Sequence, residues 1–592
     1  MFTRRPDETN SDRLSFTDFL IVCGLAAAVF FTNLGVPALW DRDEPRNAGC
    51  AREMMERHDW IVPTFNAELR GAKPALQYWF MISAYYAFGD TEFSARFWSA
   101  MLSIGTVLLT ARLGSLLAGP RVGFWSAIIL STSLMMGMAA RIATPDAYLI
   151  FFTTASIYTF AWGARSVLKR TPETGSETGT SRIPWTAAVI MYCLLGMNVL
   201  AKGPIGWLGP IAIIHLSLWC RQIVGEGVFR SAGTLFRSCW RTIRYLRPVA
   251  GLLIVLVVSA PWYIAVTLAT DGQWFIDFFL NNNLSRALTA MEKHAGPWWY
   301  YAPAILAGFF PWSVVMMPLI VDLWRRVSRE RDAADVLCVT WVVVWVAGFT
   351  LARTKLPSYV TPCYPALAIL TGRYIVRWQE GTLQIGSVFS KAPLVCYGLV
   401  GVIIGVAFLG AGYAGFGGLE PLAVLGLILG VSAVTSLWFA RLRRIRPAVG
   451  WFCAGCVLFS FSFHGLGSPR VAKFQRAEEL LQTVDQRTTE PRFASYGCLE
   501  PSWVYYAGRP IHEFRANEAE AASRFLNENA QNYLVTTNRK YLQIQSELPP
   551  ETQVIARESF FLKPHEQLVV LNVGPAGTQA TQMSEANGPS RR

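Results

Sequence analysis

A short segment near the N-terminus carries an unusual density of charged side chains. Three carboxylates and two guanidiniums lie within six residues, namely Asp41, Arg42, Asp43, Glu44 and Arg46. The segment comes directly after the first long apolar run, residues 17–36. Ionisable groups are costly beside a lipid bilayer, and they are kept mainly where they act on a charged ligand or substrate. The segment is therefore predicted to be part of a functional site.

Four further turns combine charged and aromatic side chains between apolar runs. They add seven candidates, which are Lys73, Arg141, Asp146, Lys202, Arg353, Lys355 and Tyr359. Several cations at a membrane surface suit the phosphate of a lipid headgroup. A nearby carboxylate suits a general base for an incoming hydroxyl, or a ligand for a divalent metal ion as cofactor. Asp43 and Asp146 are the candidate ligands if such a metal is present.

Each turn also has a simpler interpretation. Lys202 and Lys355 can extend along apolar surface to reach lipid headgroups. Arg46 can pair with a neighbouring carboxylate as a structural clamp. Asp146 follows a proline at a helix start, where the helix dipole stabilises a carboxylate. No single turn is specific, and the hypothesis rests on all of them facing one side of the membrane.

The composition indicates a membrane protein. Of the 592 residues, 52% are hydrophobic and only 16% are charged, whereas soluble domains carry about 25% charged residues. The net charge is +13. Basic residues in cytoplasmic loops set the orientation of a membrane protein and explain this excess. We therefore expect membrane lipids around the chain and no nucleic-acid partner.

The sequence predicts a mainly α polytopic membrane protein with about thirteen transmembrane helices, because a span needs about 20 apolar residues. The expected spans are approximately 17–36, 94–117, 122–141, 146–164, 185–201, 204–220, 248–268, 298–322, 335–352, 358–376, 392–412, 420–440 and 447–465. With the N-terminus inside, Lys and Arg concentrate in the inside loops, as the positive-inside rule requires. All the candidate turns then face outside.

The first outer loop is expected to run from residue 37 to residue 93. Within it, residues 74–88 are apolar but too few to cross a bilayer,. Counting them as a span would invert every later loop against the charge bias. We therefore expect an interfacial helix over 74–88.

An extracytoplasmic α/β domain is predicted at the C-terminus, over residues 466–575. This region is more charged than the rest and alternates helix and strand patterns. Helices are expected over 471–484 and 518–530, and strands over 503–508, 532–538, 552–561 and 566–573. The tail, residues 576–592, is rich in small polar residues and is expected to be disordered.

At these residues the chain resembles the GT-C membrane glycosyltransferases, in particular the bacterial aminoarabinose (lipid A) transferases and the related protein O-mannosyltransferases. The resemblance rests on Asp43-Glu44-x-Arg46 with Arg52-Glu53-Met54, Lys73-Pro74, Arg141 to Asp146, Lys202-Gly203-Pro204 and Lys355-Leu356-Pro357-x-Tyr359. The order and spacing of these motifs cover roughly residues 35–370.

The resemblance implies a GT-C catalytic domain over residues 1–465 in the bacterial inner membrane. It implies transfer of a sugar on the periplasmic side, from an undecaprenyl-phosphate or related polyprenyl-phosphate donor to a glycolipid or protein acceptor. Asp43 matches the catalytic carboxylate, with Glu44 beside it, and Asp146 matches a second acidic position. The positions expected near the lipid phosphate are Arg46, Lys73, Lys202 and Tyr359.

Two other classes of protein remain as alternatives. A transporter or flippase of lipid-linked sugars would share the basic site for a lipid phosphate, but it should show internal repeats and charged residues near mid-membrane. The sequence shows no such repeat, and its charged residues lie at span ends. A membrane scaffold with a partner-binding outer domain would explain the C-terminal domain but not the charged turns.

Overall fold

The computed structural model describes residues 14–40, 43–168, 182–225, 232–285, 296–329, 332–383, 387–488, 490–561 and 563–573. Asp41, Arg42 and the predicted disordered tail, 576–592, lie outside these ranges. The chain forms two compact units. The first comprises residues up to Leu39 and Asn47–Ala472, and the second comprises Trp40–Arg46 and Lys473 onward. The sequence prediction had divided the chain at residue 465.

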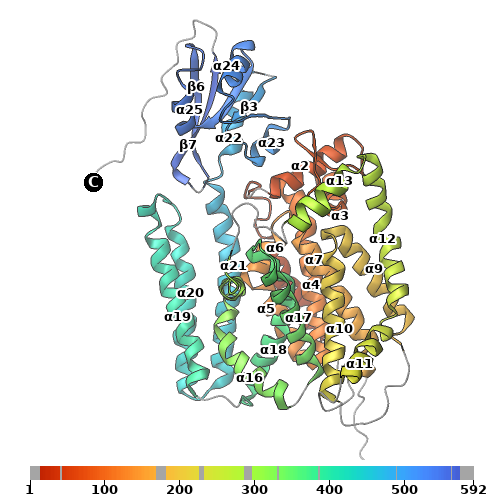
Figure 1. The fold of residues 1–592 in the computed structure, drawn as a ribbon. Coiled ribbons are helices and arrows are strands. Elements are labelled where there is room, and N and C mark those ends of the chain that lie inside the picture. Colours follow the sequence, from red (N-terminus) through yellow and green to blue (C-terminus); the bar gives the residue numbers. More distant parts are fainter. Residues whose placement is uncertain are drawn as a thin grey trace, which may run out of the picture. The chain divides into compact units, whose positions relative to one another are not determined.

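The first unit is a bundle of helices (Figure 1). Its long helices are α1 (Phe16–Phe31), α4 (Glu92–Ala118), α5 (Pro120–Ser131), α7 (Asp146–Gly163), α9 (Trp185–Lys202), α10 (Ile205–Gly225), α11 (Ala232–Tyr245), α12 (Pro248–Ala269), α16 (Met316–Arg329), α17 (Ala333–Leu351), α18 (Tyr364–Glu380), α19 (Ser387–Leu409), α20 (Ala423–Arg441) and α21 (Ile445–Ala472). Shorter elements are α6 (Leu134–Ala140), α8 (Arg165–Leu168), α13 (Gln273–Phe275), α15 (Tyr301–Gly308), a π-helix η1 (Ile276–Leu284), and the 3₁₀ helices η2 (Trp312–Val315), η3 (Pro357–Cys363), η4 (Ala411–Ala414) and η5 (Glu420–Leu422).

The expectation of a mainly helical, polytopic membrane protein is confirmed. Within the described ranges, seven helices are long and apolar enough to cross a membrane, or eight if the bent pair α5–α6 forms one span. The other expected spans are helical too, but they are shorter, broken or more polar. The span expected over 298–322 is divided into α15, η2 and α16, and Pro311 lies at the break, where it lacks the amide hydrogen needed to continue a helix. The number thirteen stays a prediction.

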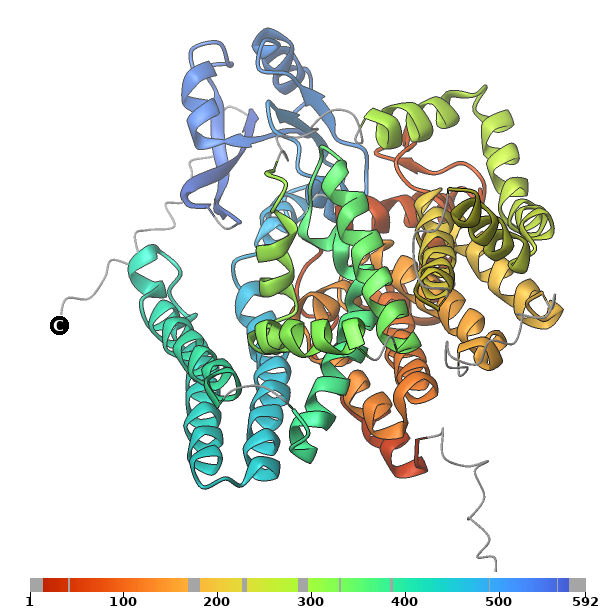
Figure 2. The ribbon, with the colours of Figure 1, turned by 60° about the horizontal axis from the view of Figure 1, so that its bottom comes forward.

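Small residues allow neighbouring helices to approach closely. A Cβ atom added to Gly426 of α20 would overlap the backbone of Gly401 and Gly405 in α19, and one added to Gly123 of α5 would overlap Ala111 and Ser115 of α4. These two helix pairs lie side by side along much of their length (Figure 2). Close backbone packing holds helices together in a membrane. There the hydrophobic effect does not drive helix association, because lipid chains are as apolar as the side chains.

The segment between α1 and α4 folds into two helices and a hairpin. These are α2 (Asp43–Glu56), β1 (Thr64–Phe65), β2 (Glu68–Leu69) and α3 (Leu76–Phe88). Glu53 of α2 accepts hydrogen bonds from the Thr64 hydroxyl (2.5 Å) and the Asn66 amide (2.7 Å), which fastens the hairpin to the helix. Helix α3 has 13 residues, about 20 Å of helix, and is too short to cross a bilayer.

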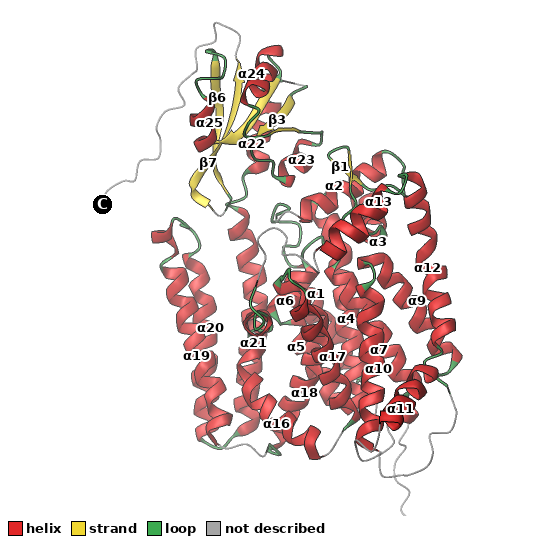
Figure 3. Ribbon diagram, in the orientation of Figure 1, coloured by secondary structure: helices red, strands yellow, loops and turns green. Residues whose placement is uncertain are grey.

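The second unit carries a five-stranded mixed sheet with helices on it (Figure 3). Its elements are α22 (Ala477–Asp485), β3 (Arg492–Tyr496), α23 (Pro501–Ala507), β4 (His512–Phe514), α24 (Ala519–Glu528), β5 (Asn532–Thr537), α25 (Asn538–Ile544), β6 (Thr552–Phe560) and β7 (Lys563–Val573). The strand order is β4-β3-β5-β7-β6, with parallel pairs β3–β4 and β3–β5 and antiparallel pairs β5–β7 and β6–β7. The expected α/β domain is confirmed.

One expected strand of this domain is wrong. Residues 503–508 were predicted as a strand because of their aromatic and β-branched side chains, but Trp503 lies in α23. Pro501 occupies the first turn of this helix, where its missing amide hydrogen costs nothing. The strands β3 and β4 were not predicted from the sequence.

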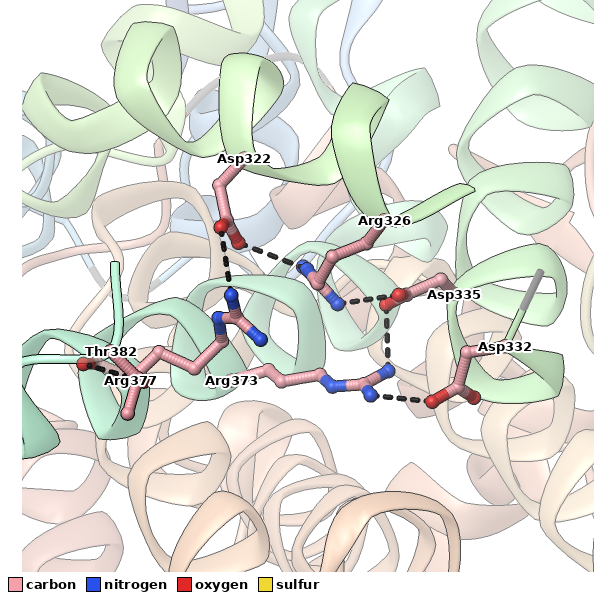
Figure 4. Close-up of polar contacts among 7 residues, drawn as sticks. All are labelled: Asp322, Arg326, Asp332, Asp335, Arg373, Arg377 and Thr382. Atoms are coloured by element: carbon pink, nitrogen blue, oxygen red, sulfur yellow. Dashed lines mark hydrogen bonds and ion pairs between the residues drawn. The ribbon is translucent and has the colours of Figure 1, made fainter. Parts of the chain in front are cut away.

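A chain of alternating charges, buried at its centre, joins three helices of the first unit (Figure 4). We call it the ionic chain, and its members in order are Arg377, Asp322, Arg326, Asp335, Arg373 and Asp332. Successive N–O distances along it are 3.4, 2.9, 2.5, 3.0 and 2.5 Å. It connects α16 and α18 to the first turn of α17. Its three guanidiniums and three carboxylates balance, as burial of charge requires.

Candidate functional site

The first group of candidate residues meets where three elements end. Asp146 begins α7, Lys202 ends α9, and Tyr359 lies in η3. The Lys202 ammonium forms an ion pair with the Asp146 carboxylate. It also lies over the Tyr359 ring, 5.7 Å from the centroid. The Lys202 ammonium thus contacts two residues that are distant in the sequence. Asp146 is 56 positions away from Lys202, and Tyr359 is 157 positions away.

The turn after α9 places Lys202 in this position. Gly203 has φ +80°, a conformation that residues with a Cβ rarely adopt, and a Cβ there would also meet the ring of Phe278,. The buried Asn198 amide donates to the Gly206 carbonyl (2.8 Å) and to the Thr153 hydroxyl (3.1 Å). The Asn198 bonds tie the turn to α7, so the Lys202 side chain is held next to the start of that helix.

Two buried arginines hold the chain that follows α1. Arg141 donates to the carbonyls of Val29, Phe30, Thr32 and Asn33 and to the Ser468 hydroxyl. Arg96 donates to the carbonyls of Leu34 (3.0 Å), Pro37 (2.6 Å) and Ala38 (3.0 Å). The last carbonyls of a helix have no partner within it, and cations satisfy them well. The structure therefore assigns Arg141 a capping role on α1.

Helix α2 is anchored through Asn47. The Asn47 side chain is buried, donates to the Ala143 carbonyl (3.0 Å) and accepts from Arg70 (3.1 Å). These bonds attach α2 to the turn that leads into Asp146. Burial raises the pKa of the neighbouring Cys50 thiol to about 12, so this thiol stays protonated at neutral pH and is no nucleophile.

The acidic residues of the first motif occupy the first turn of α2. Asp43 and Glu44 both lie there, where the helix dipole favours negative charge. Glu44 is fully buried and accepts a hydrogen bond from the Trp40 amide (3.1 Å). Asp43 and Arg46 are partly exposed and take part in further polar or electrostatic interactions. This turn groups with the second compact unit, and α2 from Asn47 onward groups with the first.

The remaining candidates have different surroundings. Lys355 is 5% exposed, and its ammonium donates to the carbonyls of Thr350 (2.8 Å) and Ala352 (2.9 Å) at the end of α17. It also lies 5.7 Å from the centroid of the Tyr301 ring. Arg353 is exposed, and Lys73 is partly exposed in the loop before α3. Lys355 thus caps a helix, as Arg141 does.

The candidate metal ligands are only partly defined by the structure. In the ranges that the structure describes, no three His, Cys, Asp or Glu side chains gather closely enough to hold a metal ion. The Asp146 carboxylate is already paired with Lys202. A metal ion between Asp43 and Asp146 remains a prediction from the sequence.

Several positioning residues were not identified from the sequence. Arg96, Asn198 and Arg70 hold the turns that carry the candidates, but each is a single polar residue with no distinctive spacing. Arg96 and Asn198 lie within apolar helical stretches, and this is the only signal that the sequence offered, because a buried polar group must find a partner.

The arrangement suits binding of an anion. The Lys202 ammonium contacts one carboxylate and one aromatic ring, and it is not fully buried. The Lys202 side chain is 18% exposed, and the Asp146 side chain is 17% exposed. An ammonium in this state has hydrogen-bond donors left for a phosphate oxygen. The carboxylate holds the ammonium in place in the absence of ligand.

Comparisons with known proteins identify relatives of this chain. A sequence profile of the family described as dolichyl-phosphate-mannose-protein mannosyltransferase matches residues 16–270. An undecaprenyl phosphate-alpha-4-amino-4-deoxy-L-arabinose arabinosyl transferase of Pectobacterium atrosepticum is 28% identical over 451 residues, which is 74% of this chain and 74% of that protein. A protein of the same name from Edwardsiella ictaluri is 28% identical over 340 residues, so that the chain spans only 56% of that relative's length.

Solved structures share the fold. The crystal structure of ArnT from Cupriavidus metallidurans bound to undecaprenyl phosphate superposes with a TM-score of 0.72 at 21% identity, covering 94% of this chain and 98% of that one. The same protein in the apo state gives a TM-score of 0.71 at 19% identity. The resemblance to the aminoarabinose transferase and O-mannosyltransferase group, expected from the sequence, is confirmed.

Proposed function

We propose that this chain, a polytopic membrane protein of the GT-C glycosyltransferase type, moves a sugar from a polyprenyl-phosphate donor to a lipid or protein acceptor. The observation that carries the proposal is the partly exposed Lys202 ammonium, held between Asp146 and Tyr359 at the end of the helix bundle. The relatives' names specify an undecaprenyl-phosphate-linked sugar as donor, and the ArnT structure contains undecaprenyl phosphate.

The proposed reaction is a substitution at the anomeric carbon. An acceptor oxygen attacks that carbon, and the bond to the lipid phosphate oxygen breaks, so that the phosphate leaves with the bonding electrons. Asp43, with Glu44 beside it, receives the proton of the acceptor. This assignment follows from the match of Asp43-Glu44-x-Arg46 to the motif of the GT-C glycosyltransferases.

Cations stabilise the leaving phosphate in this proposal. We assign Lys202, Lys73, Arg46 and Arg353 to phosphate binding, since each additional charge of the leaving group needs a partner. Tyr359 lies against the Lys202 ammonium and limits where the phosphate can bind. Arg141 and Lys355 act indirectly, because their donors are engaged by helix carbonyls.

We place the reaction on the periplasmic side of a bacterial inner membrane. Basic residues occur at the C-terminal ends of α16, α18 and α20, and these ends lie at the end of the bundle opposite to Lys202. The basic end of a membrane protein faces the cytoplasm. A polyprenyl-phosphate donor is consistent with this side, because the sugar arrives already attached to a lipid.

The central test removes the charge of Asp43. Asp43→Asn is expected to lower transfer by a factor of about 10²–10⁴, the usual contribution of a general base. Glu68→Gln is the matched control, because it neutralises an exposed carboxylate in the same outer segment. The measurement is sugar transfer from a radiolabelled polyprenyl-phosphate donor by purified, reconstituted protein. Wild-type turnover in a folded Asp43→Asn protein would remove Asp43 from the mechanism.

The same reconstituted system separates a transferase from a flippase. A transferase releases the labelled sugar from the lipid phosphate, whereas a flippase moves the intact lipid-linked sugar to the other leaflet. Movement without release would refute the proposed reaction. Binding of a partner without either event would favour a scaffold.

A further inference from the structure

Helix α11 carries three classes of side chain on three separate faces. Basic residues follow one strip of its surface, at Arg237, Arg241 and Arg244. Large apolar residues follow the adjacent strip, and small polar residues follow the third. At 3.6 residues per turn, these spacings place each class on a separate face.

The polar face fixes how the helix is turned. The Ser238 hydroxyl accepts a hydrogen bond from the Trp219 indole of α10 (3.0 Å), and Thr242 and the ring of His215 are 3.1 Å apart. Ser238 and Thr242 are 4% and 1% exposed. The helix is therefore packed against α10 through this face and cannot turn its other faces inward.

The apolar face is left uncovered within the described structure. Phe236 is 71% exposed and Trp240 is 52% exposed. Two residues beyond the helix, the Arg247 guanidinium lies over the ring of Trp185 at 4.1 Å from the centroid, and Trp185 is 54% exposed. Aromatic side chains beside basic ones are typical of the boundary between lipid chains and headgroups.

Among charged residues, the stretch that contains α11 and α12 carries basic ones only. No Asp or Glu occurs from residue 232 to residue 270, and the three arginines of α11 are exposed. Amphipathic helices with this composition lie in the plane of a membrane interface, with the apolar face among the lipid chains and the basic face on anionic headgroups.

The position of α11 selects the leaflet. It joins the end of α10 to the start of α12, and α10 begins next to Lys202 and Gly203, so α11 lies at the end of the bundle opposite to that turn. The ionic chain is at the same end, since Asp332 acts electrostatically on Arg221 of α10. The basic end of a membrane protein faces the cytoplasm.

We propose that α11 is a binding site for anionic phospholipid in the cytoplasmic leaflet. Arg237, Arg241 and Arg244 bind the phosphate-bearing headgroups, and Phe236 and Trp240 insert among the acyl chains. The site is separate from the Lys202 turn, and it does not depend on the proposed transfer reaction.

The affinity of the site is measured by native mass spectrometry of the full chain in detergent, titrated with phosphatidylglycerol or with phosphatidylcholine. The triple variant Arg237→Gln, Arg241→Gln and Arg244→Gln is expected to bind phosphatidylglycerol about 100-fold more weakly, because each basic residue near an anionic surface contributes about fivefold in affinity. Binding of phosphatidylcholine should be unchanged.

A matched control removes the same charge elsewhere at the same end. Arg441→Gln, Arg443→Gln and Arg444→Gln neutralise three exposed arginines in the turn between α20 and α21. This variant is expected to retain phosphatidylglycerol affinity within about fivefold, the size of one surface charge contribution. Equal losses in both variants would indicate diffuse surface charge and would overturn the proposal, as would no loss in the α11 variant.

The insertion of the apolar face is tested by fluorescence in vesicles of phosphatidylglycerol brominated near the headgroup. The difference between wild type and Trp240→Phe isolates the emission of one indole among the 22 tryptophans. Quenching of this difference signal supports insertion. An unquenched signal would mean that Trp240 faces water, where an acidic protein partner and not lipid would have to cover α11.

Discussion

The two ends of α17 use charge in opposite ways. At its start, the ionic chain joins six charged groups, and its central members Asp322, Arg326 and Asp335 have side chains only 4%, 1% and 1% exposed. Beyond its other end, Lys202 meets a single carboxylate, and both partners are 17–18% exposed. The helix between these regions has 19 residues, about 28 Å of helix.

The difference lies in how many interactions each cation has left to make. In the ionic chain, Arg326 bonds to two carboxylates and Arg373 bonds to two more oxygens. A buried and balanced network of this kind holds helices in one arrangement, and removing one member leaves uncompensated charge. Lys202 has one carboxylate and one ring, so an anionic ligand can bind without displacing a whole network.

Breaking the ionic chain should produce the largest effect on stability. Arg326→Met removes the partner shared by Asp322 and Asp335 and is expected to cost about 3–5 kcal/mol. Thermal unfolding of the purified protein measures this loss. Arg325→Met is the matched control, because Arg325 is exposed on the same helix and exposed charges contribute little. Equal melting temperatures for the two variants would contradict a stabilising role for the chain.

Removing the charge of Lys202 should affect the donor more than the fold. Lys202→Gln is expected to lower kcat/KM for the donor about 10–100-fold, since a hydrogen bond from a charged group contributes about 1.5–3 kcal/mol. The melting temperature should change little, because the pair is partly exposed. Lys391→Gln, in an exposed position of α19, should leave both quantities unchanged. Unaltered donor kinetics in Lys202→Gln would remove this residue from phosphate binding.

Substitution of Lys355 tests whether a cation near the candidate site also binds the donor phosphate. Lys355→Met removes the donor to the last carbonyls of α17 and is expected to cost about 1–2 kcal/mol of stability. The KM for the donor should rise by less than it does in Lys202→Gln. A rise as large as in Lys202→Gln, with unchanged melting temperature, would make Lys355 a direct ligand of the phosphate.

The sequence predicted the helices better than their lengths. Long apolar runs become helices in lipid because the backbone must satisfy its own hydrogen bonds there, and the expected runs are helical in the structure. Where they end or break is less predictable. The expected span over 298–322 contains Pro311 and divides into three pieces, which the apolar composition of the run conceals.

In the second unit, alternation of residue types predicted β5, β6 and β7 but missed β3 and β4, although β3 lies inside the sheet. The strand β5 is buried at every position, and its β-branched and apolar residues indicate a strand. Residues 503–507 have a similar composition, yet they form part of α23. Burial of a short apolar segment against a sheet does not reveal whether that segment is a helix or a strand.

By itself, the sequence determined the class of protein, and it predicted the side that each charged turn faces and the set of residues from which a site is built. These follow from hydrophobicity, the placement of basic residues and motif order, which are local properties. Only the tertiary structure decided which of those cations cap helix ends and which keep an accessible charge. Arg141 and Lys355 are engaged by carbonyls at helix ends, whereas Lys202 keeps an accessible charge beside Asp146 and Tyr359. A cation binds whichever acceptors the packing of distant helices brings within reach, and no local pattern contains that information.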